Sequence, residues 1–277
     1  MAGILYLVST PIGNLGDMTY RAVEVLRSVD FVAAEDTRVG MKLLSAFDIQ
    51  KPLVSYYEHN KRERGEVICQ RILAGENCAL TTDAGTPAIS DPGSELVAQC
   101  REYDIQVVPV PGACAAVTAY SLSGLTGGRF CFEGFLSMNR KNRREHLEGL
   151  KNEKRAMIFY EAPHKLKSTL DDLAETFGTD RGILLARELT KLHEEAIRRT
   201  IGEAIAYYAE NPPRGEFVLV VDGASDAEIA AEEAVDPVEL AKKYVAEGMR
   251  TKDAAKKAAE ETKGSKNEIY RALMECE

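Results

Sequence analysis

The stretch that decides the fold is Ala79-Leu-Thr-Thr-Asp-Ala-Gly-Thr-Pro-Ala-Ile-Ser-Asp-Pro-Gly93. Its first four residues predict a short buried strand, and the loop that follows, residues 83–93, is rich in glycine, proline, aspartate and hydroxyl residues. In an open α/β sheet, ligands bind outside the carboxyl ends of the strands, where glycine lets backbone groups approach them. We therefore predict that this loop holds a small cofactor; a glycine-rich turn without a ligand is the alternative.

Short apolar runs recur on either side of this stretch and predict further strands. They cover residues 4–9, 31–34, 53–56 and 106–110, and helix-like patterns lie between them. The helix expected at 19–28 has an apolar stripe, and Asp17 is its expected N-cap. Residues 1–124 therefore read as an N-terminal α/β domain with a mostly parallel sheet.

Two more loops rich in proline and glycine follow strands of this sheet, Ser9-Thr-Pro-Ile-Gly-Asn-Leu-Gly16 and Val110-Pro-Gly-Ala-Cys-Ala115. Three such loops at one edge of a sheet indicate a shared crevice. Neither G-x-G-x-x-G nor G-x-x-x-x-G-K-[ST] occurs, which argues against NAD and ATP as the cofactor.

The rest of the chain divides by composition. Glycines at 123–128 end a small-residue helix, so we expect a second α/β domain with a mixed sheet over residues 125–222. Residues 223–236 are acidic and predict a solvated linker or an exposed helix. Residues 237–277 predict a small helical appendage that is rich in alanine and lysine.

Bulk composition excludes several classes of protein. With 277 residues and 45% apolar residues the chain can bury real cores, and its longest apolar runs are far shorter than the roughly 20 residues that a membrane helix needs. The N-terminus does not resemble a secretory signal, and six cysteines without a C-x-x-C favour free thiols in a reducing cytosol over disulfides or zinc. Four scattered histidines predict no metal site.

A net charge of −9 argues against a protein that coats nucleic acid non-specifically. A local basic surface is still expected from residues 139–155 and from the tail. A basic run on a helix is either a solvated face or a set of phosphate contacts, and both interpretations stay open. The bases that begin this run are Arg140, Lys141, Arg143 and Arg144.

Polar side chains also follow several strands. Two strands of the first domain end in polar clusters, in Ala33-Ala-Glu-Asp-Thr-Arg38 and Ser55-Tyr-Tyr-Glu-His-Asn60. Two strands of the second domain are followed by polar clusters as well, in Glu161-Ala-Pro-His164 and in residues 186–195. Such groups line crevices, but helix capping and surface ion pairs explain part of each cluster.

Taken together and in order, these motifs resemble the tetrapyrrole (corrin/porphyrin) methylase superfamily, and most closely its ribosomal RNA branch. The motifs are Thr10-Pro-Ile-Gly-Asn-Leu-Gly-Asp17, Ala34-Glu-Asp-Thr-Arg38, the loop 83–93, Val110-Pro-Gly112, Glu161-Ala-Pro-His164 and Arg187-Glu-Leu-Thr-Lys-Leu-His-Glu-Glu195. The resemblance implies a cytoplasmic two-domain methylase, usually a homodimer, that binds S-adenosylmethionine between its lobes. It also implies methylation of a cytidine ribose 2′-hydroxyl in ribosomal RNA of the small subunit.

The family's cofactor positions carry over residue by residue. They fall on Pro11, Gly85, Thr86, Pro87, Ile89, Cys114, Ala115, Tyr160, Leu189 and Gly215. Many members have Gly-Asp-Pro where this chain has Gly85-Thr-Pro87, a difference that fits the RNA branch. Cys114 replaces a serine, and its thiol is a weaker hydrogen-bond donor, which puts that contact in doubt.

A hydroxyl acceptor must lose its proton as it attacks the methyl group, so a general base would help. The candidates at the edge of the crevice are Glu35, Asp36, His59 and Asp91, and we hypothesise that Asp36 or Asp91 orients or deprotonates the hydroxyl. The candidates for phosphate contacts are Arg38, Arg140, Lys141, Arg143, Arg144 and Lys191.

Two alternatives remain at this point. A methylase of small tetrapyrrole or corrin precursors would need neither the basic helix nor the lysine-rich tail. A non-catalytic module that binds RNA or the ribosome would keep the fold without turnover.

Overall fold

The computed structural model describes residues 1–233, 236–262 and 264–275. The chain forms two compact units, which are described separately here. The first comprises Met1–Gly149 and Ala156–Asp222, and the second comprises Leu150–Arg155 and Gly223–Glu277.

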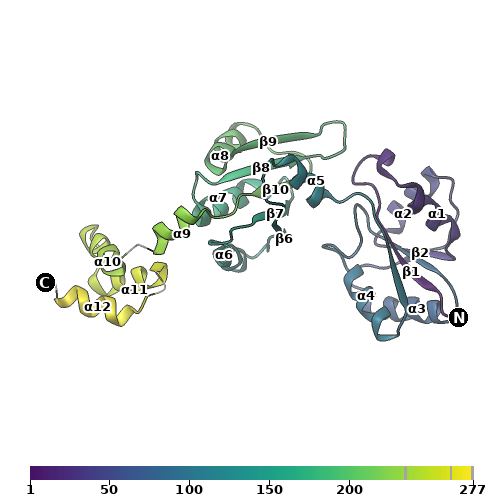
Figure 1. The fold of residues 1–277 in the computed structure, drawn as a ribbon, viewed down its shortest axis with the longest axis horizontal. Helices are drawn as coiled ribbons and strands as arrows, with labels where there is room; N and C mark the ends of the chain where they lie inside the picture. The colour runs from purple at the N-terminus through teal and green to yellow at the C-terminus, as the bar shows by residue number, and fades with distance from the viewer. Residues whose placement is uncertain (234–235, 263, 276–277) are drawn as a thin grey trace. The chain divides into compact units, whose positions relative to one another are not determined.

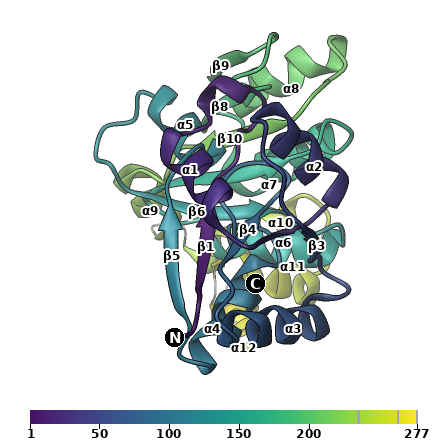
Figure 2. The ribbon, with the colours of Figure 1, turned by 90° about the vertical axis from the view of Figure 1, so that its right-hand side faces the viewer.

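The N-terminal sheet of the first unit is entirely parallel, with the strand order β3-β2-β4-β1-β5. Figure 2 shows β1 and β5 side by side, and their residues pair from Ile4↔Gln106 to Val8↔Val110. The sheet confirms the predicted architecture of this part of the chain. Its strands are β1 (Ile4–Val8), β2 (Phe31–Ala34), β3 (Leu53–Ser55), β4 (Cys78–Thr81) and β5 (Gln106–Val110).

Helices cover both faces of this sheet, so its central strands are apolar throughout (Figure 1). On one face, α1 (Tyr20–Ser28) and α2 (Thr37–Ala46) bury Leu26 and Leu44. On the other, α3 (Lys61–Leu73) and α4 (Gly93–Glu102) bury Ile68 and Leu96.

The start of α1 differs from the prediction. Its N-cap is Thr19, whose hydroxyl accepts a hydrogen bond from the Ala22 amide at 3.1 Å, whereas Asp17 lies in the short 3-10 turn η1 (Leu15–Asp17). Both residue types cap helices well. The 3-10 turn separates Asp17 from the start of the helix, and no short-range sequence pattern predicts this turn.

The second sheet of the first unit is mixed, as predicted, with the order β6-β7-β10-β8-β9. Its β6 and β7 are parallel, whereas the pairs β7·β10, β10·β8 and β8·β9 are antiparallel. The strands are β6 (Phe130–Phe135), β7 (Ala156–Glu161), β8 (Gly182–Arg187), β9 (Glu195–Thr200) and β10 (Phe217–Val221).

Four helices accompany this sheet. The helix α5 (Ala115–Leu122) packs Ala116 and Ala119 onto one face of it. The helices α6 (Arg140–Gly149), α7 (Leu166–Phe177) and α8 (Ile201–Glu210) contact one another in sequence, α6 with α7 and α7 with α8.

The second unit is helical. The acidic segment forms α9 (Asp226–Glu233), and α10 (Pro237–Ala246), α11 (Thr251–Thr262) and α12 (Lys266–Glu275) follow. Alanines of α10 and α11 form a small core with Ile269 and Leu273 of α12. Small side chains allow these helices to approach closely, which explains why the tail is so rich in alanine.

Within the described ranges, no helix has the length and apolar character that crossing a membrane requires. Five cysteines are free thiols, and Cys276 lies outside the described residues.

Candidate active site

The three loops predicted to share a crevice are hydrogen-bonded to one another. Thr10 and Gly85 exchange backbone hydrogen bonds of 2.9 and 3.1 Å, which join the first loop to the main loop. The Thr86 hydroxyl accepts from the Ser9 hydroxyl and donates to the Ala113 carbonyl of the third loop, both at 3.1 Å. The Thr86 side chain therefore links the loops at the carboxyl ends of β1, β4 and β5.

Gly85 is needed where the first loop and the main loop meet. Its φ is +83°, and a Cβ built there would lie 3.3 Å from Cγ2 of Ile12. A side chain would be strained and crowded at this position. Because Gly85 has no side chain, the backbones of the first loop and the main loop can approach each other closely at the crevice.

The rest of the main loop is held by Asp91. Its Oδ1 accepts hydrogen bonds from the amides of Ala88 at 2.9 Å and Gly93 at 2.8 Å. Ala88 and Ser90 have φ values of +67° and +65°, which side chains adopt only under constraint. Strained residues of this kind concentrate at functional sites.

These loops open onto a cavity of about 460 Å³ within the first unit. That volume lies in the range of small-molecule sites. Its walls come from Ile12, Glu35, Thr82, residues 84–86 and 89–91, Cys114, Ala115, Phe135, residues 160–163, Ala186, Glu188, Leu189, Lys191 and residues 216–218.

Most of the residues predicted to bind the cofactor line this cavity. They are Gly85, Thr86, Ile89, Cys114, Ala115, Tyr160 and Leu189. Pro11 instead lines a neighbouring hollow with Gly13, and Pro87 is buried in the loop. Gly215 packs against Glu188, whose Cγ would lie 2.5 Å from an added Cβ.

The four candidates for the general base separate into two pairs. Glu35 and Asp91 line the cavity, whereas Asp36 and His59 do not. Asp36 caps α2 and pairs with the guanidinium of Arg38 at 2.6 Å, and hydrogen bonds from Arg38 lower the pKa of Asp36 to about 2. His59 is exposed and packs edge-on against the ring of Tyr57.

Glu35 has the electrostatic environment of a base. Its Oε2 accepts a hydrogen bond from the Thr82 hydroxyl at 3.0 Å. Burial raises the pKa of Glu35 above its usual value, and the nearby carboxylates of Asp83 and Asp91 raise it further. A raised pKa brings a carboxylate closer to the value that suits general-base catalysis at neutral pH.

Lys191 joins the second lobe to the first loop. Its Nζ lies 2.8 Å from Glu188 Oε1 and 2.9 Å from Glu216 Oε2, and its aliphatic stem packs against Gly13. Glu188 and Thr190 have φ values of +50° and +66°, so this wall of the cavity also contains constrained backbone. Because two carboxylates already hold the Lys191 ammonium, its position favours a structural role over the predicted phosphate contact.

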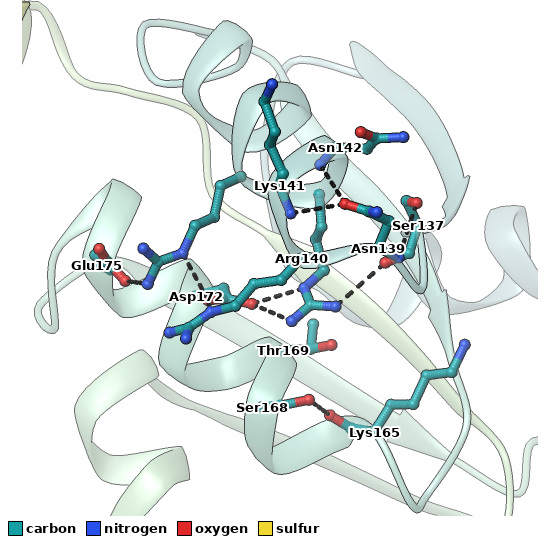
Figure 3. A network of polar contacts seen from close by, with 12 residues as sticks. Ser137, Asn139, Arg140, Lys141, Asn142, Lys165, Ser168, Thr169, Asp172 and Glu175 are labelled. Atoms are coloured by element: carbon teal, nitrogen blue, oxygen red, sulfur yellow. Dashed lines mark hydrogen bonds and ion pairs between the residues drawn. The ribbon is translucent and has the colours of Figure 1, made fainter.

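Three arginines of α6 surround the buried carboxylate of Asp172, whereas Lys141 points away from it (Figure 3). Asp172 of α7 is only 3% exposed; Arg143 Nε donates to its Oδ2 at 2.6 Å, and Arg144 Nε lies 3.3 Å from its Oδ1. Arg144 also pairs with Glu175, while Arg140, 70% exposed, lies 3.8 Å from Asp172. Lys141 is 82% exposed and lies 3.7 Å from Glu145.

This arrangement corrects part of the sequence interpretation. The side chain of Arg143 is only 12% exposed and belongs to the interior, so it is not available to a large substrate. Arg140 and Lys141 remain at the surface. The spacing of charges alone could not distinguish the inward face of α6 from its outward face.

The sequence interpretation did not single out Phe135, Glu188 or Glu216, all of which line the cavity. For Phe135 a signal existed, since an isolated glycine inside a strand pattern, here Gly134, indicates a bulge or a close approach. Within the described part of the chain, no cluster of His, Cys, Asp and Glu residues could hold a metal ion.

The fold and the cavity correspond to a known class. Residues 4–205 match the family model described as Tetrapyrrole (Corrin/Porphyrin) Methylases, and the chain belongs to this family. Solved structures of the class share the fold. Uroporphyrin-III-C-methyltransferase from Thermus thermophilus is 20% identical, with a TM-score of 0.57 over 79% of this chain and 94% of that one. A diphthine synthase is 13% identical, with a TM-score of 0.61 over 79% of this chain and 90% of that one.

Much more similar relatives are proteins named Ribosomal RNA small subunit methyltransferase I. The one from Synechocystis sp. is 48% identical over 99% of both chains, and the one from Bacillus subtilis is 48% identical over 98% of this chain and 94% of its own length. The protein from Escherichia coli O157:H7 is 44% identical over 99% of this chain and 95% of its own. The chain is therefore a methyltransferase, and enzymes of this family use S-adenosylmethionine as the methyl donor.

The walls of the cavity fit that donor. Asp91 Oδ2 is buried and has no hydrogen-bond partner among the described residues, so it can accept a hydrogen bond from a ligand. The Gly85 backbone and Thr86 of the main loop face Cys114 and Ala115 across the same cavity. These residues would hold the cofactor, together with Leu189 from the second lobe.

Proposed function

We propose that this chain transfers a methyl group from S-adenosylmethionine to the 2′-hydroxyl of a cytidine ribose in ribosomal RNA of the small subunit. One observation carries the proposal: relatives named for this RNA are 48% identical over nearly the whole chain, so the compared region contains the loops that form the cavity. At this identity and coverage, the walls of a site are expected to serve the same chemistry.

The donor's sulfonium supplies a methyl group that is already activated for transfer. The protein's task is then to align the acceptor oxygen behind that carbon, where positioning accounts for much of the rate enhancement. The constrained backbone at Ala88, Ser90 and Glu188 supports such a role, because it fixes the loops of the cavity before any ligand arrives.

Of the four carboxylate and histidine candidates, Glu35 is the one that we assign as the general base. When bound, S-adenosylmethionine would supply the methyl group on its sulfonium sulfur. The Glu35 carboxylate would take the proton that the acceptor hydroxyl loses as its oxygen bonds to the methyl carbon and the carbon–sulfur bond breaks. Asp91 lines the same cavity, but two backbone amides engage its Oδ1, so we assign it to holding the loop and, through Oδ2, to accepting a hydrogen bond from the donor. Asp36 is bound to Arg38 outside the cavity, which replaces the earlier hypothesis that it acts on the hydroxyl.

We also propose which residues contact the RNA. Arg38, Arg140 and Lys141 have exposed side chains that could meet phosphates despite the net charge of −9. Substrate contacts of Arg144 are limited by its pairs with Asp172 and Glu175. We also propose a cytoplasmic location, which the similarity to ribosomal RNA methyltransferases supports.

We also propose a homodimer, and α5 supports it. Ala116 and Ala119 pack inward, while Val117 and Leu122 are 54% and 48% exposed, so apolar side chains also lie on the outward side of the helix, beside the polar Ser121. A second copy of the chain would cover these apolar side chains. Sedimentation equilibrium should give the mass of two chains, and a Val117→Asp variant should sediment as one.

The decisive experiment measures methyl transfer from labelled donor to small ribosomal subunits that lack the modification, followed by nucleotide analysis of the product. We expect a 2′-O-methylcytidine at one position. Labelling of uroporphyrinogen or precorrins with none in RNA would favour the tetrapyrrole alternative, to which the solved structures give some weight. Absence of donor binding in calorimetry would favour a non-catalytic module.

A further inference from the structure

Phe135 is the last residue of β6 and lies in the wall of the cavity with 58% of its surface exposed. A single exposed apolar side chain is common on a protein surface, but Phe135 lies in the wall of a cavity, and ligand cavities are lined largely by apolar and aromatic side chains. None of the steps assigned above involves this ring.

A β-bulge places Phe135 there. The pairing of β6 with β7 runs Phe132↔Ile158 and then Gly134↔Phe159, so one extra residue is inserted in β6, and Gly134 has a φ of +64°. In a regular strand, residues three apart point to opposite faces. The inserted residue instead brings Phe132 and Phe135 to the same face as Tyr160.

Tyr160 packs against the Phe135 ring from one side. Phe132 and Phe135 both meet its ring edge-on, with centroids 5.0 and 5.5 Å away. The Tyr160 hydroxyl accepts a hydrogen bond from the Ala116 amide at 3.2 Å, at the start of α5. Tyr160 therefore stands between Phe135 and the wall formed by Cys114 and Ala115.

The bulge also adjoins the main loop. A Cβ at Gly134 would lie 3.1 Å from Oγ of Ser90, next to Ile89, which is 44% exposed and lines the same cavity. The open face of Phe135 is thus at the rim of the cavity, beside Tyr160 and Ile89, which are two of the residues predicted to bind the donor. Donor sites usually bury most of their ligand, so an exposed rim suits the acceptor better.

We infer that Phe135 is a platform on which the base of the acceptor nucleotide stacks. This inference rests on the proposed function, because it requires an RNA acceptor. Unpaired bases in RNA are commonly held by stacking on aromatic side chains, and each such contact contributes enough that its loss weakens binding roughly 5- to 150-fold. Stacking orients the nucleotide without reading its identity, so it would position the ribose for attack.

The test compares Phe135→Leu and Phe135→Trp with the wild type in methyl transfer to small ribosomal subunits. The leucine variant keeps an apolar side chain but no aromatic face, and we expect its KM for the subunits to rise by roughly 5- to 150-fold while its Kd for S-adenosylmethionine stays unchanged. The tryptophan variant should restore the KM. Tyr20→Leu, which removes a 93% exposed ring outside the cavity, is the matched control and should behave as wild type.

The chain contains no tryptophan, so Phe135→Trp also introduces a single fluorescent reporter at this position. S-adenosylmethionine alone should leave its emission unquenched. Strong quenching by the donor, or a raised donor Kd in the leucine variant, would assign the platform to the cofactor's adenine and overturn the inference. An unchanged KM in the leucine variant would overturn it as well. A wild-type enzyme that binds the donor but labels no RNA would instead refute the proposed function.

Discussion

Arg143 on α6 and Asp172 on α7 form an ion pair that is almost completely buried, with 2.6 Å between Nε of the arginine and Oδ2 of the aspartate. Arg143 also donates to the Ser137 carbonyl at 3.2 Å, so one guanidinium links the loop after β6, α6 and α7. The pair orders the segment that leads from the cavity wall at Phe135 to the exposed bases of α6.

Removal of this carboxylate should destabilise the first unit strongly. Asp172→Ala leaves the Arg143 guanidinium buried and unpaired, and breaking a buried pair from one side typically lowers the free energy of unfolding by about 3–5 kcal/mol. Glu175→Ala is the control, because Glu175 is 57% exposed and pairs at the surface, where the expected loss is at most about 1 kcal/mol. Urea unfolding followed by circular dichroism measures both. Equal losses in the two variants would contradict the internal role assigned to the pair.

The sequence predicts the two sheets well, because β1, β2 and β4 are short apolar runs with helical patterns between them. It also predicts the crevice, since loops after parallel strands must meet at one edge of the sheet. The sequence does not predict features of the site that depend on the direction in which a side chain points. The inward turn of Arg143 has no periodic signature, because it arises from packing between segments distant in sequence. Gly134 indicates the bulge before Phe135, but the sequence does not show that the bulge brings Phe135 to the cavity.

Gly93 should be essential for the conformation of the loop 83–93, to which we assign donor binding. A Cβ at this position would lie 2.7 Å from Asp91 Oδ1 and 2.9 Å from the Ala88 amide, which are the two atoms of the hydrogen bond that closes the turn. In Gly93→Ala that bond must open, and since hydrogen bonds to charged groups contribute about 1.5–3 kcal/mol, donor affinity should fall roughly 10- to 150-fold. Isothermal titration calorimetry measures the Kd. Gly149→Ala, where a Cβ meets nothing within 4 Å, should bind the donor as the wild type does.

The pH dependence of methyl transfer should report on Glu35. Burial holds the pKa of Glu35 above its usual 4.5, and only the carboxylate form accepts a proton. The value of kcat/KM should therefore fall with decreasing pH along a limb whose midpoint lies above 4.5, and it should be flat above that limb. Glu35→Gln should abolish the limb and lower kcat by about 10²- to 10⁴-fold without changing the donor Kd.

Asp36→Asn tests the competing assignment. Because Asp36 lies outside the cavity and faces Arg38, the variant should keep the wild-type pH profile and nearly full turnover. If Asp36→Asn removed the acidic limb and Glu35→Gln did not, the assignment of the base would have to be reversed.

Arg140 and Lys141 should supply part of the electrostatic attraction for RNA. Both follow the N-cap residue Asn139, whose Oδ1 accepts from the amides of Lys141 and Asn142 (Figure 3). Both have largely exposed side chains, in contrast to Arg143. Each phosphate that a cation neutralises adds about 0.7 to 0.9 to the slope of log affinity against log salt. The double variant Arg140→Ala, Lys141→Ala should therefore bind small ribosomal subunits more weakly at low salt, with a slope reduced by about 1.4 to 1.8. Arg101→Ala, an exposed cation on α4, should leave the slope unchanged. An unaltered slope in the double variant would show that α6 does not meet the phosphates, since removing two contacts must change the number of counterions released.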